Sequence, residues 1–385
     1  MTALELDLVG GKVLQPGAGL AQGRLSLAAG RIVAEPVGRA VDLSGYLVLP
    51  GIVDLHGDGF ERHLAPRRGA MKQIDEGVIS AEAELAANGI TTAVLAQFWS
   101  WEGGLRGREF AEQVLAAIKR TRGQVVTDVV AQLRFETHLL EDYAALPGLI
   151  ATHQVPYVVF NDHLPHDRLA EGRRPPRLTG QALKAGRNPE AHFALLQELH
   201  ARGPEVPAAL DQLCQRLSGQ GVQLGSHDDH TAQDRADWRA RGVWISEFPE
   251  TLDAAEAARA AGDTVILGAP NVVRGGSHKG NVSAIELVAM DLCDALASDY
   301  HYPSPRRAAL MVARTGVRTF AEVWALVSER PARVLGLNDR GRLEPGLRAD
   351  LVILEETSHR VAATLSGGRV SYMAGDVAVR FCTAD

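Results

Sequence analysis

His56 and Asp58 stand two residues apart, directly after an apolar run that a Pro-Gly turn interrupts at positions 50 and 51. The run predicts a short β-strand, and side chains at positions i and i+2 of a strand lie on the same face. The imidazole and the carboxylate can therefore reach one point in space, as the ligands of a metal ion must. Two ordinary polar residues at a strand end are the alternative interpretation of this segment taken alone.

Further histidines and carboxylates follow the strands expected later in the chain. Catalytic groups of an α/β barrel lie at the carboxyl ends of its strands. Any one such residue can be a solvated polar group or a helix N-cap, but chance rarely places them at most strand ends. The full set therefore predicts a metal site. After the first strand, these positions hold Glu136, His138, Asp162, His163, His227, Asp228, Asp229, His230, Glu247, Asn271 and Asp299.

The donor types indicate which metal to expect. Mixed imidazole and carboxylate ligands suit zinc, manganese or iron better than magnesium or calcium. We expect a divalent metal, two ions in number, with zinc as the first choice. Two cations about 3.5–4 Å apart would activate a water and hold a phosphoryl or carbonyl oxygen. Asp299, after the last strand, is the expected base for the proton of that water.

A glycine-rich cationic segment from Gly268 to Asn281 follows the seventh expected strand and precedes a helix expected to start near Asn281. Glycine N–H groups, a helix N-terminus and the cations Arg274, His278 and Lys279 all favour an anion. Barrels commonly bind phosphate in the loops after strands seven and eight. The segment predicts phosphate binding, and a flexible surface loop with incidental charge is the alternative.

The elements that position these residues fall into two kinds. Short apolar segments cut by glycines occupy about residues 4–49 and return at 350–354 and 377–381, so we expect strands there. They predict one small β-sandwich domain built from residues 1–49 plus 341–385. Between them, residues 50–340 alternate strand-like and helical stretches in about eight units. This pattern predicts the α/β class, as a (β/α)₈ TIM-like barrel rather than an open doubly wound sheet.

Composition narrows the class of protein. The chain has 385 residues and a formal net charge of −7, which argues against a general nucleic-acid binder. No apolar run is long enough to span a bilayer, and no signal peptide is recognisable at the N-terminus. Three scattered cysteines predict neither a disulfide framework nor a cysteine zinc site. We expect a cytoplasmic enzyme that acts on a small molecule, with a homodimer as a further expectation.

Residues 49–56, Leu-Pro-Gly-Ile-Val-Asp-Leu-His, resemble the first-strand motif of the amidohydrolase superfamily. Residues 346–352 look like the return of the chain into the sandwich domain of that superfamily. The segments around His56, Glu136, His227, Glu247 and Asp299, with the loop 268–281, resemble its phosphonate-metabolism branch. That branch comprises the α-D-ribose 1-methylphosphonate 5-triphosphate diphosphatases of the C–P lyase pathway.

The resemblance implies a reaction and a role for each matching residue. Members of this branch remove pyrophosphate from the ribose 5-triphosphate and leave the 5-phosphate at a metal centre. His56, Asp58 and Asp299 would hold the first metal, with Asp299 also as base. Glu136 would bridge the ions or hold the second with His227, and His163 and Glu247 are further ligands. The phosphate chain would be held by Asn271, Arg274, Ser277, His278 and Lys279.

Three departures from the family patterns bear on the assignment to this branch and on the substrate. Most amidohydrolases carry His-x-His on the first strand, whereas Asp58 replaces the second histidine here, as it does in the phosphonate branch. The segment 164–168 after His163 does not match the Pro-Gly-Gln-Arg-Gln stretch of that branch, and His301 is an extra histidine.

A proline-rich, basic insert that includes residues 173–187 is either a lid or a solvated excursion. An amidohydrolase that cleaves a C–N bond, such as a deaminase or cyclic amidase, is the alternative function, and a non-catalytic scaffold is a third class.

Overall fold

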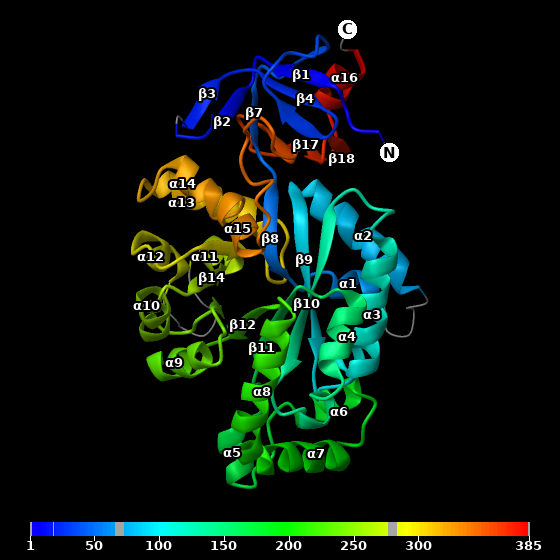
Figure 1. Ribbon diagram of the computed structural model, residues 1–385, viewed down its shortest axis with the longest axis vertical. Helices are drawn as coiled ribbons and strands as arrows, with labels where there is room; N and C mark the ends of the chain where they lie inside the picture. The colour runs from blue at the N-terminus through cyan, green and yellow to red at the C-terminus, as the bar shows by residue number, and fades with distance from the viewer. Residues whose placement is uncertain (1, 18, 66–72, 276–282, 384–385) are drawn as a thin grey trace. The chain divides into compact units, whose positions relative to one another are not determined.

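The computed structural model describes residues 2–17, 19–65, 73–275 and 283–383 (Figure 1). Its contacts divide the chain into two compact units. The first unit comprises Met1–Leu95, Thr121–Val130 and Thr264–Asp385. The second unit comprises Ala96–Arg120 and Ala131–Asp263.

Two sheets in the first unit are built from the two ends of the chain. One sheet has the order β5 (Arg31–Val33), β4 (Leu25–Ala28), β1 (Leu6–Val9) and β6 (Ala40–Asp42). The other has the order β18 (Arg369–Met373), β17 (Val361–Ser366), β16 (Leu351–Glu355), β7 (Tyr46–Pro50), β2 (Lys12–Gln15) and β3 (Gly19–Gln22). The expected sandwich from both termini is therefore present, while its boundaries at residues 49 and 341 stay a prediction.

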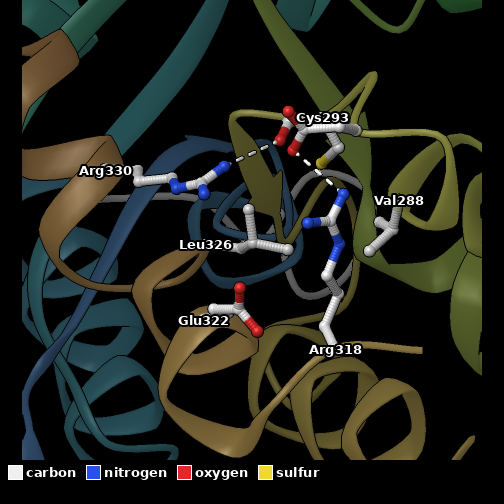
Figure 2. Close-up of a pocket in the computed structure, with 7 residues that line it drawn as sticks. Val288, Cys293, Arg318, Glu322, Leu326 and Arg330 are labelled. Carbon is white, nitrogen blue, oxygen red and sulfur yellow. Dashed lines mark hydrogen bonds and ion pairs between the residues drawn. The ribbon is translucent and has the colours of Figure 1, made fainter. Parts of the chain in front are cut away.

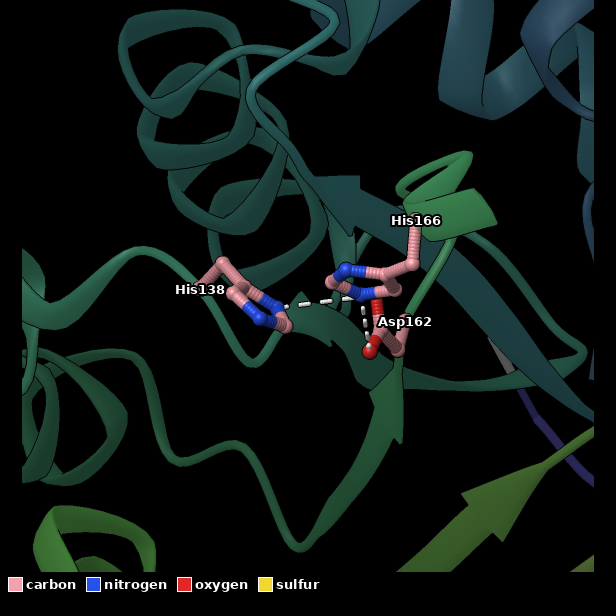
Figure 3. A group of neighbouring side chains, drawn as sticks. All are labelled: His138, Asp162 and His166. Carbon is pink, nitrogen blue, oxygen red and sulfur yellow. Dashed lines mark hydrogen bonds and ion pairs between the residues drawn. The ribbon is translucent and has the colours of Figure 1, made fainter. Parts of the chain in front are cut away.

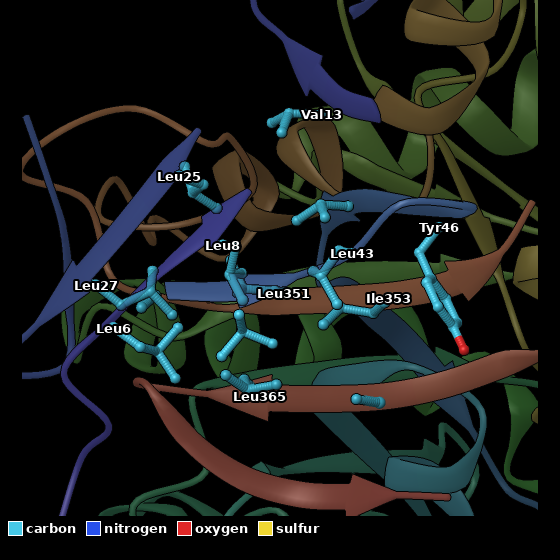
Figure 4. Packing of buried hydrophobic residues seen from close by; sticks show 14 of the residues in the cluster. Leu6, Leu8, Val13, Leu25, Leu27, Leu43, Tyr46, Leu351, Ile353 and Leu365 are labelled. Atoms are coloured by element: carbon cyan, nitrogen blue, oxygen red, sulfur yellow. The ribbon is translucent and has the colours of Figure 1, made fainter. Parts of the chain in front are cut away.

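The sandwich is held together by an apolar core to which both ends contribute. Leu6, Leu8 and Leu27 from the N-terminal strands pack with Leu351 and Leu365 from the C-terminal ones (Figure 4). All five are essentially inaccessible to solvent. Because their apolar surface leaves water only when both ends of the chain meet, hydrophobic burial joins segments that lie more than 300 residues apart.

The expected strand at 377–381 is wrong, because this segment is helix α16 (Asp376–Thr383). Val377 and Phe381 are buried, whereas Val379 is 61% exposed. Residues i and i+4 share a face in a helix, but the residue between them points away. The exposure of Val379 is what a helix requires and what a strand buried on the same face would forbid.

Eight parallel strands form the nearly closed barrel expected from the sequence. Their order in the sheet is β8 (Ile52–Gly57), β9 (Ile90–Trp99), β10 (Asp128–Glu136), β11 (Tyr157–Asn161), β12 (Gln223–His227), β13 (Ile245–Glu247), β14 (Thr264–Gly268) and β15 (Ala295–Ala297). Every residue of β8, β9 and β11 is buried, as expected for strands covered on both faces. A parallel bridge between Gly57 and Asp299 links the two ends of the sheet.

Helices alternate with these strands, as the period of the sequence predicts. Besides α16, the α-helices of the described residues outside the insert are α1 (Glu61–Leu64), α2 (Ile74–Ala87), α3 (Arg108–Thr121), α4 (Leu146–His153), α8 (Val206–Gly219), α9 (Ala232–Ala240), α10 (Leu252–Ala261), α11 (Ala269–Arg274), α12 (Ala284–Ala289), α13 (Ser304–Thr315), α14 (Phe320–Ala325) and α15 (Glu329–Val334). The 3₁₀ turns are η1 (Gly104–Arg106), η2 (Leu140–Asp142) and η3 (Gly203–Glu205).

The basic insert is a folded part of the second unit. It forms α5 (His166–Ala170), α6 (Leu178–Lys184) and α7 (Pro189–Ala201). Leu164, Leu169, Leu178 and Leu196 from this region pack with Trp101 in an apolar cluster of their own. Because these side chains are buried, the segment is more than a solvated excursion.

The segment expected to be a loop from Gly268 to Asn281 is helical in its first part. Helix α11 begins directly after β14, and it carries Asn271 and Arg274. Pro270 lies in the first turn, where a backbone N–H has no acceptor within the helix, so its missing N–H costs no helical hydrogen bond. Gly275 ends the helix with a left-handed backbone, at φ 76°. Ser277, His278 and Lys279 lie outside the described residues. The next helix, α12, begins at Ala284 rather than near 281.

Two smaller observations complete the fold. In the described residues, no helix is both long enough and apolar enough to cross a membrane. A hollow in the first unit is lined by Arg318, Arg330, Leu326 and Cys293 (Figure 2), and it measures only about 10 Å³. Arg330 donates to the Cys293 carbonyl at 3.3 Å. A space of this size holds at most one water.

We predict that Leu365→Ala lowers the free energy of unfolding by about 2–5 kcal/mol, because it leaves a cavity in the sandwich core. Val370→Ala on the neighbouring strand is the matched control, since Val370 is 38% exposed. Urea denaturation followed by circular dichroism measures both. Equal midpoints for the two variants would show that this core contributes little to stability.

Candidate metal centre

The first unit brings together three of the ligands expected from the sequence. His56 lies near the end of β8, Asp58 follows that strand, and Asp299 follows β15. One ligand atom from each of the three lies within 4.8 Å of the others. His56 is fully buried, and the two carboxylates are partly exposed. The cluster thus offers one imidazole nitrogen and two carboxylates to a cation that reaches it from solvent.

Backbone hydrogen bonds place these three residues. The Asp299 N–H donates to the His56 carbonyl at 2.8 Å, and the Asp58 N–H donates to the Asp299 carbonyl at 2.9 Å. Asp299 has a left-handed backbone, with φ 55°. This conformation is uncommon for a residue with a side chain, although aspartate tolerates it better than most. Both backbone groups of Asp299, its N–H and its carbonyl, are therefore hydrogen-bonded to the end of β8 and the residue after it.

Asp54 is a residue of this region to which the sequence assigned no role. Its carboxylate accepts from the Ser298 N–H at 2.8 Å and from the Ser298 hydroxyl at 2.5 Å. Burial raises the pKa of Asp54 to about 6, although these hydrogen bonds act in the opposite direction. A Cβ on Gly57 would lie 3.0 Å from this carboxylate and 2.9 Å from Tyr302, so only glycine fits between the two ligands. A carboxylate two residues before His56, on the same face of an apolar strand, is the signal in the sequence that could have indicated Asp54.

Arg274 is hydrogen-bonded to the residue that follows Asp299. Its guanidinium donates to the Tyr300 hydroxyl at 2.5 Å and to the Asn271 side-chain oxygen at 2.6 Å. Tyr300 immediately follows Asp299, so the bond to Tyr300 connects the guanidinium to the segment that carries this candidate ligand. Arg274 is exposed to solvent.

The second unit pairs two further expected ligands with each other. Glu136, at the end of β10, is fully buried and accepts from the His163 N–H at 3.1 Å and from its Nδ1 at 2.5 Å. Burial lowers the pKa of His163, but the hydrogen bond and charge of Glu136 outweigh it and raise the pKa overall. In this pairing Glu136 orients the ring and leaves Nε2 as the nitrogen that can meet a cation.

His227 and Glu247 form the other pair. The His227 Nδ1 lies 3.4 Å from Glu247, whose other oxygen accepts from Gln132 at 2.8 Å and from the Tyr157 hydroxyl at 2.6 Å. Burial and the charge of Glu247 raise the pKa of Tyr157 well above its ordinary value. The buried guanidinium of Arg134 donates to His227 Nε2 at 2.6 Å. That nitrogen must then be the acceptor, so Arg134 occupies the atom with which His227 would bind metal.

Arg134 was missed by the sequence analysis, because it lies inside β10 and not at its end. The available signal was the position of Arg134 two residues before Glu136, on the same face of the strand. The guanidinium also lies 4.0 Å from the Phe98 ring centroid. An aromatic face and an imidazole nitrogen are partners suited to a buried cation.

The Asp229 carboxylate is held by buried protein groups. Its Oδ2 accepts from Ser226 at 2.8 Å, from Ser246 at 2.6 Å and from Arg235 at 3.1 Å. Arg235 is also buried and donates to Asp263 at 2.9 Å. The N-cap of α9 is Thr231, which forms a capping box with Asp234, so neither Asp228 nor Asp229 caps that helix.

The ligand sets differ in how well they fit a metal. Among the described residues, two groups of three or more ligand-type side chains have atoms within 4.8 Å: His56, Asp58 and Asp299, and separately His138, Asp162 and His166. The first group supplies mixed nitrogen and oxygen donors, which fit a zinc-type ion. Glu136, His163, His227 and Glu247 are joined in pairs but do not form such a group.

Comparisons with known proteins identify the family of this chain. A family model described as the amidohydrolase family matches residues 300–372. The chain is 34% identical over 337 residues to the alpha-D-ribose 1-methylphosphonate 5-triphosphate diphosphatase of Escherichia coli (strain K12), covering 84% of this chain and 86% of that protein. This chain belongs to the amidohydrolase superfamily. The resemblance seen in its first-strand motif is thereby confirmed.

Solved structures show the same fold for this amidohydrolase. N-acyl-D-glutamate deacylase from Bordetella bronchiseptica, complexed with zinc and a phosphonate inhibitor, has a TM-score of 0.62 at 16% identity and covers 96% of this chain and 97% of its own. N-acetylglucosamine-6-phosphate deacetylase from Pasteurella multocida has a TM-score of 0.62 at 11% identity, over 95% and 99% of the two chains. At such identities the likeness concerns the fold alone.

We predict that Asp229→Asn in this amidohydrolase lowers the free energy of unfolding by about 3–5 kcal/mol, because it removes a charge that faces buried Arg235. The amount of metal bound per folded chain should stay the same, since the Asp229 carboxylate accepts hydrogen bonds from Arg235 and two serines. Chemical denaturation and elemental analysis measure the two quantities. Asp167→Asn, at an exposed position, is the control. Loss of metal without loss of stability would make Asp229 a ligand.

Proposed function

We propose that the protein is a metal-dependent hydrolase that releases pyrophosphate from α-D-ribose 1-methylphosphonate 5-triphosphate and leaves the 5-phosphate. The observation that carries the proposal is the cluster of His56, Asp58 and Asp299, with Arg274 bonded to the residue after Asp299. A metal-ligand set beside a cation suits the hydrolysis of a polyphosphate. The similarity to the E. coli diphosphatase supports the choice of substrate.

His56, Asp58 and Asp299 would hold one divalent ion in the first unit. In the second unit, Glu136 and His227 would hold another, with His163 and Glu247 as further ligands. Zinc is the proposed metal, with manganese or iron as alternatives. When bound, such ions lower the pKa of water and stabilise charge on phosphoryl oxygens. Binding through His227 Nε2 requires that Arg134 give up its hydrogen bond to that atom.

The residues of the chain would divide the remaining work. The Asp299 carboxylate accepts the proton of the attacking water, whose oxygen forms the new bond to phosphorus while the phosphoanhydride bond breaks. Arg274 neutralises phosphate charge, and Asn271, which accepts from Arg274, fixes the direction of the guanidinium. Ser277, His278 and Lys279 are proposed to contact the same phosphate chain. Asp54 holds Ser298, and so the start of the segment that presents Asp299.

A C–N-cleaving amidohydrolase is the competing function. It would need the same metals but would have no evident use for Arg274. The deacylase and the deacetylase among the structural neighbours bear names of that chemistry, but they share only the fold with this chain. A cytoplasmic location and a homodimer remain proposals.

We predict that the metal-loaded enzyme releases pyrophosphate from the ribose 1-methylphosphonate 5-triphosphate. A coupled pyrophosphate assay measures the product, and chelator-treated enzyme is the control. The panel includes a nucleoside triphosphate and several cyclic amides. Amide cleavage without pyrophosphate would retain the metal site and overturn the substrate.

We predict that Arg274→Ala lowers kcat/KM for the triphosphate about 10–100-fold, because a charge-assisted bond to phosphate is lost. The matched control is Arg314→Ala, an exposed arginine on α13. Bound metal should not change in either variant. Steady-state kinetics at fixed metal concentration distinguish them. Unaltered turnover in Arg274→Ala would remove the phosphate-binding role.

A further inference from the structure

A second ligand cluster lies in the second unit and takes no part in the proposed hydrolysis. It consists of His138, Asp162 and His166, whose side chains face one another (Figure 3). The neighbouring chain positions Glu136 and His163 bond to each other and not to this cluster. The cluster is therefore a separate feature that the function proposed above does not explain.

Ordered elements position the three side chains. His138 follows the end of β10, Asp162 follows the end of β11, and His166 is the first residue of α5. The Asp162 carboxylate accepts from the Leu164 N–H at 3.2 Å, which orders the intervening turn. Leu164 is buried in the apolar cluster with Trp101, which anchors the start of α5. The backbone that carries Asp162 and His166 is thus fixed by hydrogen bonding and by apolar packing.

The donor atoms of this cluster are close enough together to be ligands of one ion, and His166 is also within hydrogen-bond distance of Asp162. His138 Nδ1 lies 3.5 Å from Asp162 Oδ1, and His166 Nε2 lies 3.2 Å from the same oxygen. His138 Nδ1 also lies 3.3 Å from the Thr137 hydroxyl. Both contacts of His138 are long for hydrogen bonds. Ligands about 2.0–2.2 Å from a tetrahedral ion lie roughly 3.3–3.6 Å apart, close to the separations observed.

From this geometry we propose that His138, Asp162 and His166 form a second binding site for a divalent transition-metal ion of the zinc type. Two imidazoles and one carboxylate are a donor set that zinc accepts. Three protein ligands leave a fourth position for water or another small donor. The cluster lines an open cavity of about 360 Å³ together with Val206, Leu210 and Trp238. Asp162 and His166 are 39% and 37% exposed at the side chain, so an ion has access.

His200 is the residue that would orient a ligand of this site. Its Nδ1 lies 2.8 Å from His166 Nδ1, so one of the two nitrogens must donate. When His166 Nε2 bonds to metal, Nδ1 of the same ring carries the proton and donates to His200. Metal-bound histidines usually donate their second N–H in this way. His200 comes from the far end of α7, so the folded insert contributes to the site.

The test is zinc stoichiometry of the full-length protein, after removal of metal by a chelator and equilibration with buffered free zinc. We expect His166→Gln and His138→Gln, made separately, each to bind about one zinc per chain fewer than the wild type. His359→Gln, a histidine on neither ligand list, is the control and should bind as the wild type does. Far-UV circular dichroism verifies the fold, and if one variant unfolds the other decides.

A second variant distinguishes orientation from ligation. His200→Gln should retain the zinc stoichiometry but weaken the affinity of this site about 10–100-fold, because the partner of His166 is altered. Cobalt substitution gives an independent readout, since the visible absorption of the site should disappear in His166→Gln. Folded His138→Gln and His166→Gln proteins that bind as much zinc as the wild type, with unchanged cobalt spectra, would overturn the proposal. The proposal does not depend on the hydrolytic function, because neither measurement uses the substrate.

Discussion

The closure of the barrel between β8 and β15 is the interaction on which the first ligand cluster depends. The two backbone hydrogen bonds of Asp299 connect the ends of strands that lie 240 residues apart in sequence. Without them His56 and Asp58 would share a strand end but lack a third ligand. The Asp54–Ser298 bonds reinforce the same junction from within, and they are buried, where such bonds exchange little with water. Fold closure and ligand assembly are thus one event in this chain.

Backbone strain accumulates at the ends of the strands that carry the candidate ligands. Asp228 directly follows β12, Phe248 directly follows β13, and Asp299 lies two residues after the end of β15. Their φ angles are 59°, 56° and 55°, respectively. Such conformations cost of order 1–3 kcal/mol each and persist when the surroundings impose them. Phe248 is the clearest case, because a bulky residue gains nothing from a left-handed backbone. In the second unit, the buried carboxylate of Asp229 pairs with Arg235 and accepts from Ser226 of β12 and Ser246 of β13, which connects these two strands near their ends.

The sequence predicted the alternation of strands and helices and the residues at the strand ends, because both follow from local periodicity. It failed where one periodicity fits two structures: Val377 and Phe381 share a face in a strand and in a helix alike. It also failed where a contact joins distant segments. Arg134 meets His227 across 93 residues, and His166 meets His200 across 34, and no local pattern specifies either pair. The boundary of α11 was missed because glycines at 268 and 275 resemble a loop, although they flank a helix.

The segment after His163 shows what a departure from a family pattern contributes to the structure. Residues 164–168 differ from the stretch expected in the phosphonate branch, which weakened the substrate assignment from sequence. In the structure this segment starts α5 and supplies His166, whose contacts are with Asp162 and His200. His163, the preceding residue on the expected ligand list, keeps its pairing with Glu136. The departure therefore places a histidine in a separate cluster and leaves the contact between Glu136 and His163 in place.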